Sequence, residues 1–121
     1  GSTEYTFPRL VLGPEASQRE VWEAVLAGQG GRGSLVDRFC LARENVMLLA
    51  YGQTGTGKTH TLFGPESALA SSSPHPDWGL FPRLVDAVLR CMCSGEHAAG
   101  KSSFLLTVGA VEFTLASALT C

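Results

Sequence analysis

The stretch Val46-Met47-Leu48-Leu49-Ala50-Tyr51, followed by Gly52-Gln53-Thr54-Gly55-Thr56-Gly57-Lys58-Thr59, decides the fold. The first part is a continuous apolar run of strand length, which suits a central parallel strand buried on both faces. The second part matches G-x-x-x-x-G-K-[ST], the motif of a phosphate-binding loop between a strand and a helix. We therefore expect a strand at 46–51, a phosphate loop at 52–59 and a helix that begins near Lys58.

Each fixed position of this loop has a chemical role. Glycines allow the backbone to turn so that successive N–H groups face inward, where they can bind the phosphates of a nucleotide. Lys58 would place its positive charge near the β- and γ-phosphates, and the Thr59 hydroxyl would bind Mg²⁺. A glycine-rich surface turn with an incidental Lys-Thr is the alternative. The predicted strand before the motif and the predicted helix after it favour the phosphate loop.

Outward from the loop, the pattern alternates between strands and helices. Ser17 and Glu20 form a capping box that starts a helix ending at Gly28. A glycine-rich linker at 28–34 leads to a second amphipathic helix over 35–42, and a third is predicted over 84–92. Further strands are expected at 5–12, on a sheet edge because of Pro8, and at 104–111. Gly64-Pro65 and the polar stretch 71–77 indicate a loop. This order predicts an α/β fold with a layered sheet and helices on both faces.

Composition narrows the classes of function. The chain has 121 residues, 45% of them hydrophobic, and a net charge of −2, which fits at most one globular domain. Because no basic patch occurs, we expect neither nucleic-acid binding nor attachment to an anionic membrane. The longest uncharged apolar run is too short to cross a bilayer, and the first residues do not resemble a signal peptide. The cysteines fit no zinc motif and are expected to be reduced, as in an intracellular protein; they are Cys40, Cys91, Cys93 and Cys121.

The segment Ala50–Thr61 resembles the phosphate loop of kinesin motor domains, which reads A-Y-G-Q-T-x-x-G-K-T-H-T. The resemblance extends in order along residues 5–113. The further matching segments are Gly13–Gln18 with Val21-Trp22, Asn45 before the strand, Leu62-x-Gly64, Gly79–Arg83 and Val108–Phe113. It implies an incomplete kinesin motor domain with a P-loop NTPase-like fold over 5–113, followed by a divergent tail at 114–121.

The chain also departs from the family. Pro8, the 28–34 insertion, Arg43-Glu44 and Thr114-Leu115-Ala116 replace the usual kinesin residues. Neither the switch I sequence N-x-x-S-S-R-S-H nor the switch II sequence D-L-A-G-S-E occurs in the 121 residues. Glu112 follows an apolar run, as a Walker B carboxylate would. The simpler interpretation is an ordinary charged residue at the end of a strand. No catalytic residue is therefore assigned.

The resemblance implies a microtubule motor that binds and hydrolyses ATP with Mg²⁺, located in the cytoplasm on the cytoskeleton. The implied nucleotide-binding residues are Gly52, Gln53, Thr54, Gly55, Thr56, Gly57, Lys58, Thr59 and His60, with Thr59 on the metal. His60 would lie near the adenine or ribose, or else simply on a helix surface. The segment 65–78 matches a long loop where several kinesins bind small inhibitors, and Trp78 there either lines a pocket or anchors the loop.

Two other hypotheses stay open. The first is an ATP- or ADP-binding regulatory fragment without motor activity, which the missing switch sequences favour. The second is a P-loop enzyme of another family, such as a small kinase, for which Arg83 and Arg90 would be a weak acceptor site.

Overall fold

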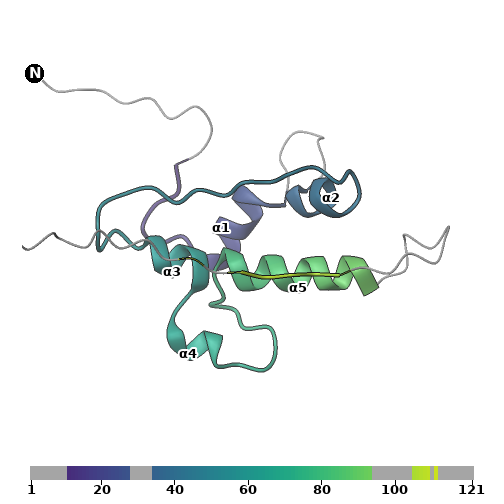
Figure 1. Cartoon of the computed structure of the whole chain (residues 1–121). Coiled ribbons are helices and arrows are strands. Elements are labelled where there is room, and N and C mark those ends of the chain that lie inside the picture. Colours follow the sequence, from purple (N-terminus) through teal and green to yellow (C-terminus); the bar gives the residue numbers. More distant parts are fainter. Residues whose placement is uncertain (1–10, 28–33, 94–104, 110, 112–121) are drawn as a thin grey trace, which may run out of the picture.

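A computed structural model describes residues 11–27, 34–93, 105–109 and 111. Within them the chain forms five helices, shown in Figure 1. They are α1 (Gln18–Val25), α2 (Leu35–Cys40), α3 (Lys58–Phe63), α4 (Glu66–Leu69) and α5 (Leu80–Cys93). The predictions for 5–10, 28–33, 104, 110, Glu112 and the tail at 114–121 fall outside the described residues.

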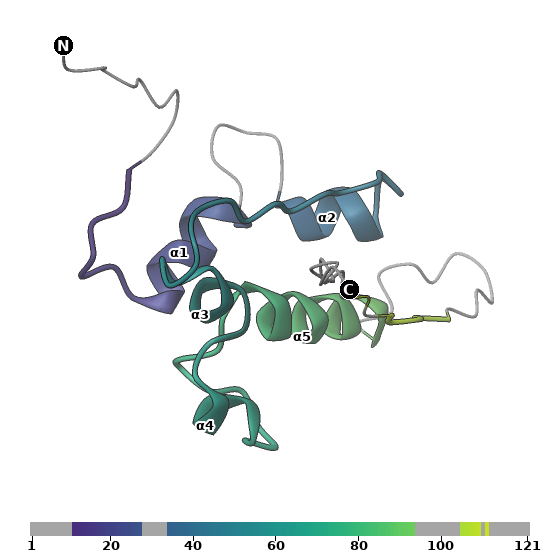
Figure 2. The same ribbon diagram turned by 60° about the vertical axis from the view of Figure 1, so that its left-hand side comes forward.

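The longest helix, α5, organises the described part of the molecule. It packs against α1, α2 and α3, and Figure 2 shows these helices gathered along it. Leu80 and Val88 of α5 are buried, as are Leu26 after α1 and Val36 of α2. Burial of these side chains supplies the main attraction between the helices. No described helix is long and apolar enough to cross a bilayer.

The first two helices begin at capping boxes. The Ser17 hydroxyl accepts a hydrogen bond from the Glu20 amide at 3.2 Å, and the Glu20 carboxylate accepts one from the Ser17 amide at 2.7 Å. These bonds lower the pKa of Glu20, because they favour its charged form. Ser34 and Asp37 repeat the arrangement at α2. The capping box predicted at Ser17 is therefore confirmed, and α2 begins by the same device.

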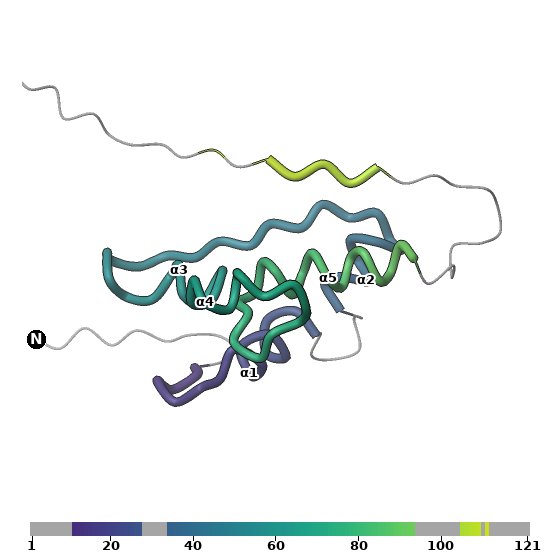
Figure 3. Tube along the Cα trace, turned by 90° about the horizontal axis from the view of Figure 1, so that it is seen from below, coloured from purple at the N-terminus to yellow at the C-terminus, as the bar shows by residue number. Residues whose placement is uncertain are grey.

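The segments at 46–51 and 105–109 are extended but form no hydrogen-bonded strand in the described residues. Figures 1 and 3 show both segments running in one direction, while α5 runs in the opposite direction between them along the chain. This is the chain path of a β-α-β unit. Strand assignment depends on ladder hydrogen bonds, however, and none joins the described segments. The predicted sheet is thus not confirmed.

The prediction that 46–51 is buried on both faces is wrong for this structure. Side chains alternate between two faces along an extended segment. Met47, Leu49 and Tyr51, all on one face, are 89%, 80% and 96% exposed. On the other face Val46 and Ala50 are half-buried, and Leu48 between them is 37% exposed. The segment therefore packs through one face only.

The loop between α3 and α5 has its two ends close together in space. Gly79 donates its amide to the Phe63 carbonyl at 3.1 Å, so the end of α3 touches the start of α5. Between them lies α4, a single turn that the sequence pattern did not predict. The third helix was expected over 84–92 but begins at Leu80, because Pro82 falls in the first turn, where its missing N–H costs no hydrogen bond. The second was expected over 35–42 and ends at Cys40.

Candidate nucleotide-binding site

The phosphate loop turns on glycines in backbone conformations that other residues rarely adopt. Gly52, Gly55 and Gly57 have φ values of 151°, 84° and 86°. At Gly52 an added Cβ would come within 2.8 Å of the Thr56 Oγ1 atom, so a side chain there would also lack space. Thr56 stabilises the turn, because its hydroxyl donates to the Gln53 carbonyl at 2.8 Å. The predicted role of the glycines in turning the backbone agrees with this geometry.

Backbone donors remain available along the loop. Within the described part of the chain, the amides of Thr54, Gly55 and Gly57 donate to no protein acceptor, whereas the Thr56 amide donates to the Gln53 carbonyl at 3.4 Å. Gly57 precedes α3 as its N-cap and makes no side-chain capping hydrogen bond. A set of exposed N–H groups on one turn is the donor arrangement that binds anions.

The Lys58 side chain folds back over this turn. Its Nζ donates to the Gly52 carbonyl at 2.8 Å and to the Gln53 carbonyl at 2.5 Å. An ammonium group has three N–H donors, so one more is available for a ligand. The carbonyls of Gly52 and Gln53 thus fix the position of the Lys58 ammonium on the loop, and its predicted contact with the β- and γ-phosphates stays a prediction.

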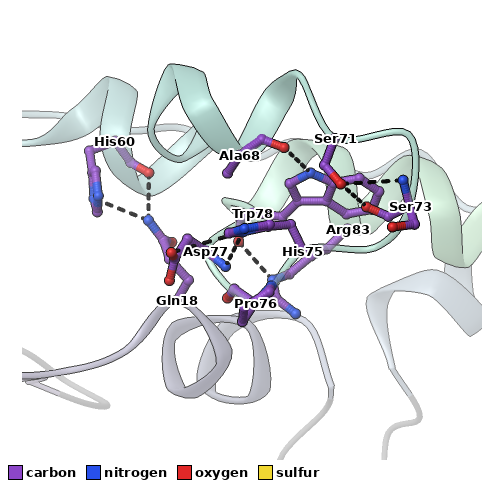
Figure 4. Close-up of polar contacts among 10 residues, drawn as sticks. All are labelled: Gln18, His60, Ala68, Ser71, Ser73, His75, Pro76, Asp77, Trp78 and Arg83. Atoms are coloured by element: carbon purple, nitrogen blue, oxygen red, sulfur yellow. Dashed lines mark hydrogen bonds and ion pairs between the residues drawn. The ribbon is translucent and has the colours of Figure 1, made fainter.

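His60 is placed by a contact from α1. The Gln18 Nε2 atom donates to the His60 carbonyl at 2.7 Å and lies 3.1 Å from its Nδ1 atom (Figure 4). The carbonyl can only accept, so the Gln18 amide must present its NH₂ group here, and Nδ1 of the neutral ring then accepts. A neutral ring that accepts at Nδ1 carries its N–H on Nε2. His60 remains exposed, and neither sequence alternative for its role is decided by this geometry.

Gln18 was missed as a site residue by the sequence reasoning. It is buried at 9% exposure, although glutamine is usually at the surface. A signal was present: Gln18 precedes Val21, Trp22 and Val25 by three, four and seven positions, which puts a polar side chain on the apolar face of α1. The sequence could not reveal its partner, because His60 lies 42 positions away.

The donors of the phosphate loop at 52–59 suit a nucleoside triphosphate with Mg²⁺. The N–H groups of the loop and the Lys58 ammonium are all hydrogen-bond donors, which suits phosphate oxygens. A larger residue would not fit at Gly52, because its Cβ would collide with Thr56. Thr59 lies in the first turn of α3 and is exposed. No group of three or more His, Cys, Asp or Glu in the described residues could hold a metal ion. If Mg²⁺ is bound with the nucleotide, the Thr59 hydroxyl would supply a protein oxygen and the phosphates and water the others.

A second polar cluster fixes the loop that leads into α5. The Trp78 Nε1 atom donates to the Ala68 carbonyl at 2.9 Å, and Arg83 donates to the carbonyls of Trp78 and Pro76 at 2.7 and 2.5 Å (Figure 4). Trp78 is half-buried and therefore anchors this loop. This is one of the two roles that the sequence suggested for Trp78, the other being to line a pocket. Trp78 does not line the neighbouring cavity of about 600 Å³, whose lining residues are Arg19, Trp22, Glu23, Ala27, Pro74, His75, Pro76 and Arg83.

Comparison with known proteins identifies the family of the chain. The sequence matches the kinesin motor domain family over residues 1–115. It is 44% identical over 76 residues to kinesin-like protein KIN-14M of Oryza sativa subsp. japonica, which covers 63% of this chain and 5% of that protein. It is 40% identical over 84 residues to kinesin-like protein Klp61F of Drosophila melanogaster, covering 68% and 7%.

A third relative, kinesin-like protein KIF25 of Macaca fascicularis, is 37% identical over 100 residues, covering 80% of this chain and 16% of the relative. The chain thus spans only a small part of the length of these relatives. No solved structure matches the chain significantly. The family match covers nearly the whole chain and includes the phosphate loop at 52–59. The chain belongs to the kinesin motor domain family.

Proposed function

We propose that residues 52–59 bind the phosphates of ATP with Mg²⁺, and that the chain is the nucleotide-binding part of a kinesin-like ATPase that moves along microtubules. The observation that carries the proposal is that one loop holds the Lys58 ammonium on its Gly52 and Gln53 carbonyls and also has amides, at Thr54, Gly55 and Gly57, that donate to no acceptor in the described part of the chain. Membership of the kinesin motor domain family supports the extension from nucleotide binding to a motor.

The proposed roles follow from the chemistry of each group. The amides of Thr54, Gly55 and Gly57 would donate to phosphate oxygens, and Lys58 would neutralise charge on the β- and γ-phosphates. Thr59 would contribute one oxygen to Mg²⁺, which when bound screens the phosphate charge during phosphoryl transfer. His60 is exposed one residue further, where the neutral ring has an N–H at Nε2 to offer a nucleotide base or ribose.

The test is a titration with a fluorescent ADP analogue and Mg²⁺. We expect saturable binding that weakens by about 10- to 100-fold in Lys58→Ala, because a hydrogen bond from a charged donor contributes roughly 1.5–3 kcal/mol. Lys101→Ala is the matched control, since Lys101 is the only other lysine of the chain. Circular dichroism on each variant checks that it is folded. Equal binding by both variants would contradict the proposal.

A second candidate is nucleotide binding without motor activity. It needs only the phosphate loop, whose turning glycines and Lys58 lie in the described residues, and no further part of a motor domain. This candidate predicts nucleotide binding but no rise in ATP turnover when microtubules are added to this chain. Turnover that rises with microtubules and is lost in Lys58→Ala would exclude it.

A further inference from the structure

Two cysteines meet where α2 packs against α5. On α2, Val36 is buried and Cys40 follows it by four positions, so both lie on the face turned to α5. On α5, Val88 is buried and Cys91 follows it by three positions on the same face. Cys40 and Cys91 therefore extend the buried faces of two helices that are packed together.

The environment of the pair agrees with direct contact. Cys91 is close enough to contribute to the raised pKa of the Cys40 thiol, and both side chains are half-buried. Phe39, next to Cys40, lines one cavity of about 260 Å³ with Val88. Cys93, two positions beyond Cys91, is rotated by about 200° around the helix axis and is exposed.

We propose that Cys40 and Cys91 are a disulfide-forming pair, which a small-molecule disulfide oxidises to a covalent link between α2 and α5. None of the described cysteines is disulfide-bonded in the structure, so the inference concerns a modification of the reduced protein. The packing of α2 on α5 already brings the two side chains together, which is the requirement that most cysteine pairs fail.

The reaction proceeds by two thiol–disulfide exchanges. Cys91, having lost its proton to solvent, attacks one sulfur of the small disulfide, and the S–S bond breaks to release one small thiol. Cys40 then loses its proton and attacks the Cys91 sulfur, which releases the second small thiol. The two protein thiols give up two electrons and two protons, and the small disulfide takes them up.

The order of attack follows from the environment of Cys40. Burial, followed by the hydrogen bond with Cys91, raises the pKa of the Cys40 thiol to about 11, so Cys40 stays protonated near neutral pH. A protonated thiol is a poor nucleophile. Cys40 is therefore the resolving thiol, and it reacts only once the adjacent mixed disulfide has formed.

The resulting link would enclose the phosphate loop. The chain between Cys40 and Cys91 contains all of residues 52–59 together with α3 and α4. Closing this segment lowers the conformational entropy of the unfolded chain. Oxidation is thus expected to raise the unfolding midpoint in urea, and reduction with a dithiol is expected to restore the original value.

The deciding experiment maps the link in the full chain after incubation with oxidised glutathione. Trypsin would release Cys40 in fragment 39–43 and both Cys91 and Cys93 in fragment 91–101. Fragmentation of the linked peptide then gives the ratio of Cys40–Cys91 to Cys40–Cys93 bonds. In urea this ratio should be near one, because the two loops are almost equal in length. Under native conditions we expect it to rise about tenfold or more, because only Cys91 faces Cys40.

Two variants complete the design. Cys93→Ser should form the link as the parent chain does, whereas Cys91→Ser should give only mixed disulfides with glutathione. A native ratio equal to the ratio in urea would overturn the proposal. So would a link from Cys40 to Cys93 or Cys121, or a native chain that stops at glutathione adducts.

Discussion

At the scale of single residues, Gln18 combines a satisfied donor with an unsatisfied acceptor. Its Nε2 atom binds His60, but its Oε1 atom is buried without a hydrogen-bond partner in the described structure. The His60 carbonyl also accepts from the Gly64 amide at 2.8 Å, so it would stay satisfied if Gln18 were lost. The cost of replacing Gln18 therefore depends on what replaces it.

We expect Gln18→Leu to change the free energy of unfolding by less than about 1 kcal/mol, because it removes an unsatisfied buried atom along with the hydrogen bonds. Gln18→Glu should cost about 2–3 kcal/mol more, because it places a carboxylate against the His60 carbonyl in a buried site. Urea unfolding of both variants checks the ranking. Gln53→Glu is the control, since the same chemical change there falls on an exposed side chain. Equal loss in Gln18→Leu and Gln18→Glu would contradict this account of the contact.

A second residue-scale prediction concerns Cys40 and pH. Burial raises the pKa of its thiol from 9.0 to about 11 in the folded protein, so the folded state holds this proton more tightly than the unfolded chain. The stabilisation is complete below pH 9.0 and is lost as the pH rises toward about 11. We expect urea midpoints to fall less across this window in Cys40→Ala than in the parent chain.

The control for that titration is Cys93→Ala, which removes an exposed thiol from α5. It should keep the full slope of the parent chain across the same pH window. Parallel curves for the parent chain and Cys40→Ala would show that Cys40 does not titrate with a raised pKa.

At the scale of elements, two glycines bring α3 and α5 together. An added Cβ at Gly79 would lie 2.5 Å from the Phe63 amide nitrogen, and one at Gly64 would lie 2.3 Å from the Asp77 carbonyl oxygen. Both neighbours are backbone atoms, which cannot move aside without shifting an element. Gly64 also has a φ of 87°, which strains any other residue.

We expect Gly79→Ala to lower the free energy of unfolding by about 1–3 kcal/mol through this collision. Gly64→Ala should cost more, because a strained φ adds about 1–3 kcal/mol. Gly13→Ala is the matched control, since a Cβ there would meet nothing within 4 Å. Urea unfolding gives the free energy of unfolding of Gly79→Ala, Gly64→Ala and Gly13→Ala. If Gly79→Ala behaved like Gly13→Ala, then α3 and α5 would not approach each other as closely as described.

At the scale of the whole molecule, the sequence could predict what depends on neighbours along the chain. The Ser17 capping box and the turning glycines of the phosphate loop are local patterns, and the structure has both. The Gln18–His60 contact and the closure of α3 on α5 join distant positions, which periodicity does not encode. The sheet was predicted from the apolar runs, their alternation with helices and the kinesin resemblance. A strand also needs hydrogen-bonded partners, however, and the described residues supply none to 46–51.

The one-sided packing of 46–51 leads to a final prediction about its two faces. The side chains of Met47 and Leu49 are exposed, whereas Val46 is half-buried. Met47→Ser together with Leu49→Ser should therefore change stability by less than about 1 kcal/mol, as surface substitutions do. Val46→Ser should cost more than that pair, because it removes packed apolar surface and half-buries a hydroxyl. Urea unfolding gives the ranking, and a hydrophobic dye reports the exposed face, with fluorescence expected to fall only in the double variant. If the double variant were instead the less stable of the two, both faces of 46–51 would be packed, as the apolar run alone had predicted.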